Sequence, residues 1–399
     1  MTIPKPATHQ IPTYILPLIV FSQFAGTSLW FVGNAILPEL QQQMHLESQV
    51  LGTITSIVQL GFISGTLVFA ILAIADRFAP SAVFFSCSIL AATANAAIAL
   101  LAKDVYTLMT FRFLTGFFLA GIYPVGMKIA ADWYEKGLGK ALGYLVGALV
   151  LGTAFPHLLK GSSYRLPWRE IIYTTSLVAF AGGLLMLLFV PAGPWRKKGS
   201  SFHPKALINI FRSKDFRAAA GGYFGHMWEL YTFWAFVPVL LQAHLQYSAA
   251  NINISLWSFI IIGVGSLSCV AGGYISKKTG SARVAFYALL LSGICCCIPW
   301  LLVKTAPFIF LFYMMVWGIA VIADSPQFSA LVAQTAPAEN KGTALTFVTC
   351  IGFAITIGSI QLLNYLLQQF TSVTTFLILV PGPIMGLLAL YRLVKTSRR

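Results

Sequence analysis

Long apolar runs separated by short polar or proline-rich breaks dominate the sequence. Each run is about 20 residues or longer, enough for an α-helix rising about 1.5 Å per residue to cross a hydrocarbon core of about 30 Å. Strands of a membrane barrel alternate in polarity over only about ten residues, so they do not fit this pattern. We therefore predict an all-α membrane protein with twelve transmembrane helices, near residues 12–37, 49–73, 80–102, 105–131, 138–160, 169–191, 216–243, 252–274, 280–303, 306–333, 341–368 and 371–395.

The composition agrees with this prediction. Hydrophobic residues make up 58% of the chain and charged residues 9%, whereas about 25% of an average soluble domain is charged. The first apolar run lacks an Ala-x-Ala-like cleavage site, so we interpret it as a helix and not as a signal peptide. The six cysteines lie inside predicted helices without ligand-spaced histidines, and we expect neither a metal nor another cofactor.

The net charge of +15 raises the question of a nucleic-acid partner. Most of the 26 lysines and arginines, however, fall in loops on the side of the predicted membrane that holds both termini. The positive-inside rule assigns that side to the cytoplasm. We therefore expect no nucleic-acid partner, and expect these loops to face the acidic lipid surface of the bilayer.

The sequence also shows signs of duplication. Its longest polar stretch divides six predicted helices from six, and because six is even, the second set enters the membrane in the same orientation as the first. We predict an N-terminal six-helix bundle at 1–191, a cytoplasmic linker at 192–215 and a C-terminal bundle at 216–399, related by a parallel pseudo-twofold repeat with a solute site between them. The residues that match at offsets of 200 to 202 are Pro38 with Pro238, Asp76-Arg77 with Lys277-Lys278, Gly116 with Gly318, and Pro124 with Pro326.

Several short segments carry a family resemblance. The fourth predicted helix contains RFLTGFFLAGIYP, with Arg112, Gly116, Ala120 and Pro124 four residues apart, and resembles the helix-4 signature of the major facilitator superfamily. The loop GYISKKTGSAR resembles the superfamily's cytoplasmic loop motif with lysine where an acid is usual, and LAIADRFAP is its shortened first-half counterpart. The resemblance implies the superfamily fold, and the basic and acidic turns are candidate gating contacts at Asp76, Arg77, Lys277, Lys278 and Arg283.

The fifth predicted helix, GYLVGALVLGTAFP, carries glycines at 143, 147 and 152 before a proline. It partly resembles the glycine-rich helix associated with antiporters in this superfamily. Glycines four residues apart also let neighbouring helices approach closely, so simple packing is the alternative.

A carboxylate lies at the centre of the seventh apolar run. Glu229 is about 17 Å from either end of this run at about 1.5 Å per residue, and His226 lies on the same helix face. A central charge costs about 2.5–3.5 kcal/mol to insert and usually serves a function. Burial favours the neutral form of a carboxyl group and a nearby cation favours its ionised form, so we predict that Glu229 carries a coupled proton. Substrate contact and a structural ion pair are the alternatives.

Two further intramembrane charges belong to the predicted coupling set. Asp324 lies near Pro326, which frees a carbonyl near Ile322, and a broken helix beside an acid is typical of ion and substrate sites; a structural cap is the alternative. Arg112 occupies a position that the resemblance associates with coupling, whereas the alternative is that it bonds neighbouring backbone carbonyls. The predicted coupling residues are Glu229, Asp324, Arg112 and His226.

Polar side chains in the first helix form one stripe at spacings of four, three and four, and such a stripe needs a wet cavity or a partner helix. Aromatic residues of helices 4 and 7 are candidate walls of the same cavity, although core packing and lipid contact are alternatives. The predicted substrate-binding residues are Gln23, Thr27, Trp30, Asn34, Tyr123, Trp228, Tyr231 and Gln327.

These features favour a proton-coupled secondary active transporter that moves a small organic solute by alternating access. Two acids against one arginine favour a cationic or zwitterionic solute. The sequence lacks a nucleotide-binding loop and the common hydrolase and redox motifs, so we do not expect an enzyme. Alternatives are a proton antiporter that exports drugs or metabolites and a non-transporting sensor with a transporter fold. We expect a monomer in a bacterial inner membrane with both termini cytoplasmic.

Overall fold

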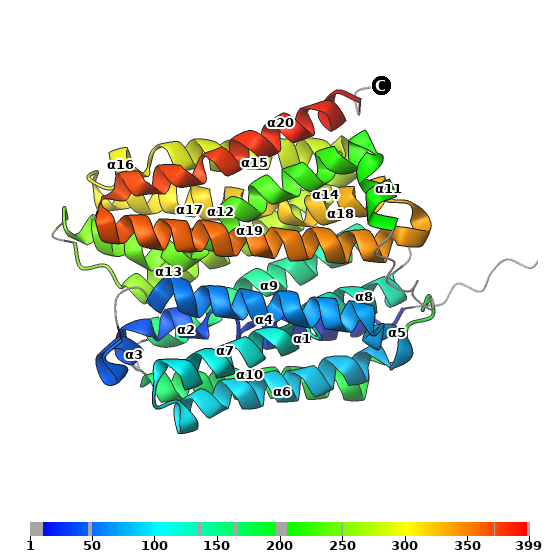
Figure 1. Cartoon of the computed structure of the whole chain (residues 1–399), viewed down its shortest axis with the longest axis horizontal. Coiled ribbons are helices and arrows are strands. Elements are labelled where there is room, and N and C mark those ends of the chain that lie inside the picture. Colours follow the sequence, from blue (N-terminus) through cyan, green and yellow to red (C-terminus); the bar gives the residue numbers. More distant parts are fainter. Residues whose placement is uncertain are drawn as a thin grey trace, which may run out of the picture.

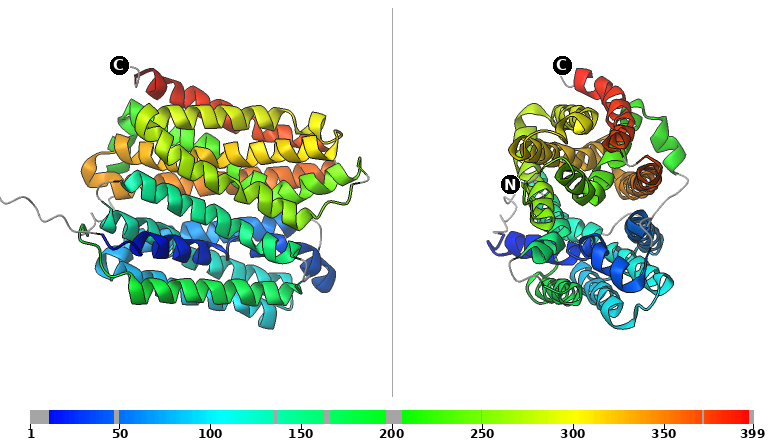
Figure 2. Two further views of the ribbon diagram at one scale, coloured as in Figure 1. Left: turned by 180° about the vertical axis from the view of Figure 1, so that it is seen from behind. Right: turned by 90° about the vertical axis from the view of Figure 1, so that its left-hand side faces the viewer.

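The computed structural model describes residues 11–46, 50–134, 137–162, 166–196, 206–248, 250–370 and 372–396 of the chain. These residues form α-helices and short 3₁₀ helices, and no strand occurs among them. The predicted all-α class is therefore confirmed. Figure 1 shows the helices of the first half gathered below those of the second half, and the two views of Figure 2 show the same separation.

The first half begins with a broken helix and continues with longer ones: α1 (Ile15–Thr27), α2 (Val32–Ala35), α3 (Leu37–Met44), α4 (Val50–Ile71), α5 (Ile74–Arg77), α6 (Pro80–Leu101), α7 (Val105–Leu119), α8 (Tyr123–Trp133), α9 (Leu138–Gly161) and α10 (Trp168–Phe189). A short helix, α11 (Ala206–Arg212), lies within the predicted linker. The second half contains α12 (Lys214–Leu245), α13 (Ile254–Gly263), α14 (Gly265–Thr279), α15 (Ser281–Cys297), α16 (Pro299–Leu302), α17 (Pro307–Ala323), α18 (Ser325–Thr335), η1 (Ala338–Asn340), α19 (Lys341–Gln369), η2 (Val373–Leu379) and α20 (Pro381–Thr396).

Nine helical segments of the described residues are long and apolar enough to cross a membrane. The other three predicted crossings have identifiable differences. The first is broken after α1, the ninth contains α15 of only 17 residues, and α12 has 32 residues but carries charged side chains at its start and its centre. The chain is an integral membrane protein.

Matched prolines break the fourth and tenth predicted helices at corresponding places. Helix α7 ends at Leu119 and α8 resumes with Pro124 in its first turn, while α17 ends at Ala323 and α18 resumes with Pro326 in its first turn. Proline has no N–H to donate and fits the first turn of a helix, where that N–H has no partner. The two prolines therefore mark equivalent breaks in the two halves.

Matched glycines also occupy equivalent positions. A Cβ atom on Gly116 would collide with the carbonyl oxygen of Val58 in α4, and one on Gly318 with the carbonyl oxygen of Ile261 in α13. Neither backbone oxygen can move away as a flexible side chain would. Each half therefore needs glycine at this close crossing of two of its helices.

The two halves meet mainly where α4 packs on α19 and where α9 packs on α13 and α14. We call the end of the bundle at which α1 and α12 begin the terminal end, and the other the opposite end. Near the terminal end, Cβ atoms built on Gly143 and Gly147 would lie 3.0 Å and 3.1 Å from carbonyl oxygens of α14. Toward the opposite end, the Asn253 side chain donates to the Gly161 carbonyl at 3.0 Å. The backbones of α9 and its partners are thus in close contact across the interface.

Candidate functional site

Six aromatic side chains meet between the two halves, near the middle of their helices. Phe62 and Phe353 have ring centroids 4.5 Å apart, and Trp30 stacks on Phe353 at 5.6 Å with an interplanar angle of 21°. Tyr231 lies 5.0 Å from Phe353 and 5.3 Å from Trp234. Each of the six side chains is 3% exposed or less. We call them the central aromatic cluster: Trp30, Phe31 and Phe62 from the first half, and Tyr231, Trp234 and Phe353 from the second.

Glu229 points into the core of the second half. Its carboxylate accepts hydrogen bonds from Trp317 Nε1 of α17 at 2.7 Å and from Ser292 Oγ of α15 at 3.0 Å. The side chain is 1% exposed, and Phe233, one turn later, packs on the Trp317 ring with centroids 4.4 Å apart. Since Tyr231 faces the first half and lies about 200° around the helix from Glu229, the carboxylate is turned away from the interface. In this conformation Glu229 therefore makes its hydrogen bonds within the second half.

The structure brings His226 and Asp324 together. His226 Nδ1 lies 2.9 Å from Asp324 Oδ1, and the two residues are 1% and 0% exposed. The contact joins α12 to the break between α17 and α18, where Asp324 is the connecting residue. The carbonyl of Ile322, predicted to be freed by this break, accepts from the Cys269 thiol of α14 at 3.7 Å.

Arg112 is fully buried and holds the broken first helix. Its guanidinium donates to the Leu29 carbonyl at 3.1 Å and to the Trp30 carbonyl, both of which lie between α1 and α2. It also donates to Asn95 Oδ1 at 3.4 Å, and the Asn95 amide donates to Ser176 Oγ of α10 at 3.0 Å. These contacts agree with the alternative interpretation of Arg112, in which its side chain bonds neighbouring backbone carbonyls.

The stripe predicted on the first helix does not face one cavity, because the helix is interrupted after Thr27. Thr27 Oγ1 bonds the Gln23 carbonyl at 2.8 Å, within its own helix. Among the described residues, the amide atoms of Gln23 have no hydrogen-bond partner although the side chain is fully buried. The four members face different neighbours: Gln23 lies against Gly126 of α8, Thr27 against Gly152 of α9, Trp30 in the central aromatic cluster, and Asn34 donates to Thr55 of α4 at 2.8 Å.

Three other predicted substrate residues, Trp228, Gln327 and Tyr123, are not among the ring pairs that form the cluster in the described part of the chain. Trp228 Nε1 donates to the Ile378 carbonyl of η2 at 2.8 Å, within the second half. Gln327 lies beside Gly272 of α14. Tyr123 is the first residue of α8 and packs partly buried on the hydrophobic core.

Two of the predicted gating residues, Asp76 and Lys277, make described contacts within their own halves. Asp76 is paired with Lys128 of α8, and Arg77 and Lys278 are exposed. The Lys277 ammonium lies 5.8 Å from the ring centroid of Tyr274 on its own helix. Arg283 is only partly exposed. A different lysine makes a contact across the interface here: the Lys140 ammonium of α9 lies 5.6 Å from the ring centroid of Tyr274.

Sequence reasoning missed several residues that complete these groups. Phe31, Phe62 and Phe353 are ordinary members of a chain that is 14% aromatic, so their pattern carries no distinguishing signal. Ser292 and Asn95 carried a detectable signal, since a buried polar group inside a membrane helix requires a partner.

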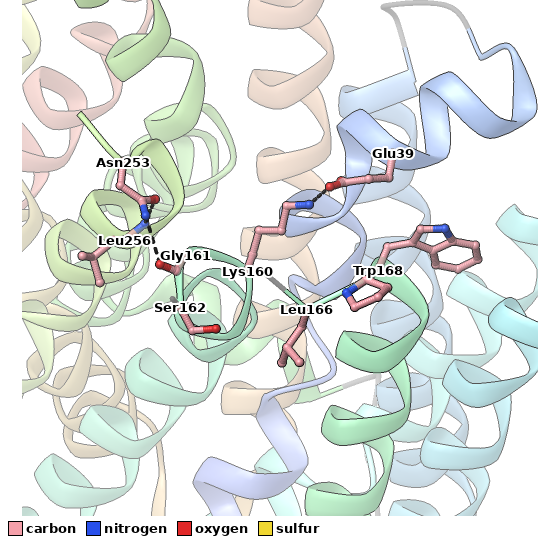
Figure 3. Close-up of a pocket in the computed structure, with 9 residues that line it drawn as sticks. Glu39, Lys160, Gly161, Ser162, Leu166, Trp168, Asn253 and Leu256 are labelled. Carbon is pink, nitrogen blue, oxygen red and sulfur yellow. Dashed lines mark hydrogen bonds and ion pairs between the residues drawn. The ribbon is translucent and has the colours of Figure 1, made fainter. Parts of the chain in front are cut away.

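A cavity of about 810 Å³ opens at the opposite end (Figure 3). An ion pair between Lys160 and Glu39 lies on one side, and the bond from Asn253 to Gly161 closes another. None of the predicted site residues lines this cavity. Its lining residues are Glu39, Lys160, Gly161, Ser162, Leu166, Pro167, Trp168, Asn253 and Leu256.

Comparison with known proteins identifies the family. The family model described as Major Facilitator Superfamily matches residues 19–360. The human organic anion transporter MFSD10 (TETRAN) has a similar structure, with a TM-score of 0.75 at 15% identity, covering 95% of this chain and 100% of that one.

Two curated relatives match shorter stretches. The "Ascochitine biosynthesis cluster MFS transporter" of Didymella fabae is 33% identical over 93 residues, which is 23% of this chain and 18% of that protein. An uncharacterised transporter of Schizosaccharomyces pombe is 30% identical over 128 residues, or 31% of this chain and 20% of that protein. Each alignment thus spans about a fifth of the curated relative's length. The helical repeat and the fold of the solved structure agree with the family model, which covers most of this chain. The chain is thus an integral membrane protein that belongs to the Major Facilitator Superfamily.

Proposed function

We propose that the chain is a proton-coupled secondary active transporter that moves a small organic solute by alternating access. The observation that carries the proton-coupling part is the environment of Glu229. A carboxylate that is 1% exposed accepts from two neutral donors, the Trp317 indole and the Ser292 hydroxyl. Hydrogen bonds to a charged group contribute about 1.5–3 kcal/mol each, whereas burying an isolated ion costs several kcal/mol even after relaxation. The ionised form therefore depends on both donors staying in place.

That dependence links protonation to movement. The acceptor is on α12, whereas the two donors are on α17 and α15. A shift of these helices that lengthens either hydrogen bond destabilises the ionised carboxylate. The neutral acid is affected less, because it carries no buried charge. By linkage, binding of a proton favours the arrangement in which the bonds are weaker. Glu229 thus couples a proton to the packing of the second half without touching the solute.

The His226–Asp324 pair is a second proton site in this proposal. It joins α12 to the break that precedes α18, so protonation of Asp324 weakens the link between α12 and that break. In the first half, Arg112 stabilises the break between α1 and α2 by donating hydrogen bonds to the carbonyls of Leu29 and Trp30.

The interface between the halves supports alternating access. It is built from stacked rings and from glycine backbones against carbonyl oxygens. Small-residue contacts of this kind allow helices to slide at close range. The halves can therefore rock while each keeps its own core.

The test uses proteoliposomes that contain a trapped pH-sensitive dye. A thermal-shift screen of metabolites on the purified protein first supplies a solute. Adding that solute to wild-type vesicles should change the internal pH, whereas Glu229→Gln should bind the solute and leave the internal pH unchanged. Solute-driven proton movement that persists in Glu229→Gln contradicts the role of this residue, and its absence in the wild type contradicts proton coupling altogether.

A proton antiporter that exports its solute is a second candidate. The observation in its favour is the close packing of Gly143 and Gly147 against α14, on the helix whose glycine pattern partly resembles that of antiporters. The direction of proton movement in the same vesicles discriminates the two, because a symporter moves protons with the solute and an antiporter moves them against it.

A further inference from the structure

The central aromatic cluster has the composition of a binding site for a particular class of solute. Its rings come in two sets, Trp30, Phe31 and Phe62 from one half and Tyr231, Trp234 and Phe353 from the other. When the halves separate, these two sets lose their contacts with each other. A flat apolar molecule between the sets restores ring stacking on both faces, so the cluster favours an aromatic body.

Two members of the cluster have unused hydrogen-bond donors. Trp30 and Trp234 are 1% and 0% exposed, and neither indole Nε1 has a hydrogen-bond acceptor among the residues that the structure describes. An indole N–H can only donate, and a buried donor without a partner is unfavourable. The two indoles therefore point to a ligand that presents acceptor oxygens.

An amide lies close to the same place on α4. Gln59 is three residues before Phe62 and thus on the same helix face. It is fully buried, and neither of its amide atoms has a partner among the described residues. Gln59 supplies a third polar contact at the edge of the rings, and it is able to donate or accept.

The charges around the cluster disfavour a cation. Glu229 is bonded within the second half and Asp324 lies against His226, so neither acid that suggested a cationic solute faces the rings. The charged group that contacts the cluster's backbone is a cation, because the Arg112 guanidinium donates to the Trp30 carbonyl. An acceptor with negative or no charge suits this field better than an ammonium group.

We infer that the central aromatic cluster binds a flat aromatic solute that carries acceptor oxygens and no positive charge, with Trp30 and Trp234 as its hydrogen-bond donors. This inference rests on the proposed transport function and assigns the solute class for the same site. In this arrangement the solute contacts the aromatic rings and indole groups between the halves. Protons bind to carboxyl groups in the core of the second half.

The test compares three probes that share one ring system and differ in charge: 1-naphthoate, 1-naphthamide and 1-naphthylmethylammonium. Binding to the purified full-length protein in lipid nanodiscs is measured by calorimetry at pH 7. The naphthoate and the naphthamide should bind, and the ammonium compound should bind at least about tenfold more weakly. Because one hydrogen bond to a charged group corresponds to about a tenfold change or more in affinity, Trp30→Phe and Trp234→Phe should each weaken naphthoate binding by about that factor.

A matched control is Trp133→Phe. Trp133 is also a buried indole, but its Nε1 donates to the Pro191 carbonyl at 3.1 Å, within the first half. This variant should bind naphthoate as the wild type does. The inference is overturned if the ammonium probe binds as tightly as naphthoate, if none of the probes binds at millimolar concentration, or if the two cluster variants behave like the control. Since binding is measured without a proton gradient, the result stands or falls separately from proton coupling in vesicles.

Discussion

The hydrogen bond between Trp317 and Glu229 offers a direct measurement of how much the second half stabilises its buried carboxylate. Trp317→Phe removes the indole N–H that lies 2.7 Å from Glu229 Oε1 but keeps a ring that can pack on Phe233. The smaller ring also loses packing, so the single variant alone does not isolate the hydrogen bond. A double-mutant cycle with Glu229→Leu, which removes the acceptor and preserves an apolar volume, does so.

The expected coupling free energy follows from the charge of the carboxyl group. A hydrogen bond to an ionised group contributes about 1.5–3 kcal/mol, and one between neutral groups about 0.5–1.5 kcal/mol. A coupling above about 1.5 kcal/mol thus indicates an ionised Glu229 in this conformation, and a smaller one indicates the protonated acid. The second donor, Ser292 at 3.0 Å, is unchanged in all four proteins of the cycle.

The free energy of unfolding is measured for the four proteins in mixed micelles with increasing dodecyl sulfate. A thermal-shift series on the same samples checks that the unfolding transition remains cooperative. Independent sites add within about 0.3–0.5 kcal/mol, so a coupling energy below about 0.3 kcal/mol would refute the idea that this hydrogen bond stabilises the carboxylate.

Two further predictions concern the interface and a helix cap. A Cβ atom added to Gly147 would lie 3.1 Å from the Ser266 carbonyl oxygen of α14, so Gly147→Val should push α9 away from α14 and lengthen the distance between spin labels at positions 139 and 278. Gly358→Val should not, because no described atom lies within 4 Å of the position that its Cβ would take. The pKa of Asp104 is held below its ordinary value by the backbone N–H of Thr107, which donates to it at 2.8 Å. This stabilisation is present at neutral pH and is lost as the pH falls below about 4, so the thermal midpoint of the wild type should fall in acid more than that of Asp104→Asn; equal acid sensitivity of the two proteins contradicts this.

Features that depend on one residue's own backbone chemistry were predictable from the sequence. Pro124 and Pro326 break their helices at matched places because proline has no N–H to donate, and Gly116 and Gly318 lie at matched crossings because no side chain fits there. The repeat in these residues therefore predicted a repeated fold. The pairing of His226 with Asp324 was not foreseen, although each was selected singly.

Features that depend on the orientation of whole helices were not predictable. The direction of Glu229 follows from which face of α12 meets the first half, and both faces of that helix are aromatic and buried. The stripe on the first helix assumed a continuous helix, but the sequence contains no proline at residues 28–31 to announce the break. There the buried guanidinium of Arg112, from a distant segment, satisfies the freed carbonyls.

The placement of charge within each half has a mechanical consequence. Lys128 with Asp76 and Lys160 with Glu39 are paired in the first half, and His226 with Asp324 and Arg392 with Asp215 in the second. Arg112 and Glu229 likewise form their hydrogen bonds with residues of their own halves. Movement of one half relative to the other in the proposed cycle therefore leaves these charged groups paired. The contacts that must change are those between the aromatic rings and between the glycine backbones and their carbonyl partners. In the proposed alternating-access cycle, the barrier to reorientation therefore depends on the contacts between the two sets of rings and on the solute that replaces them.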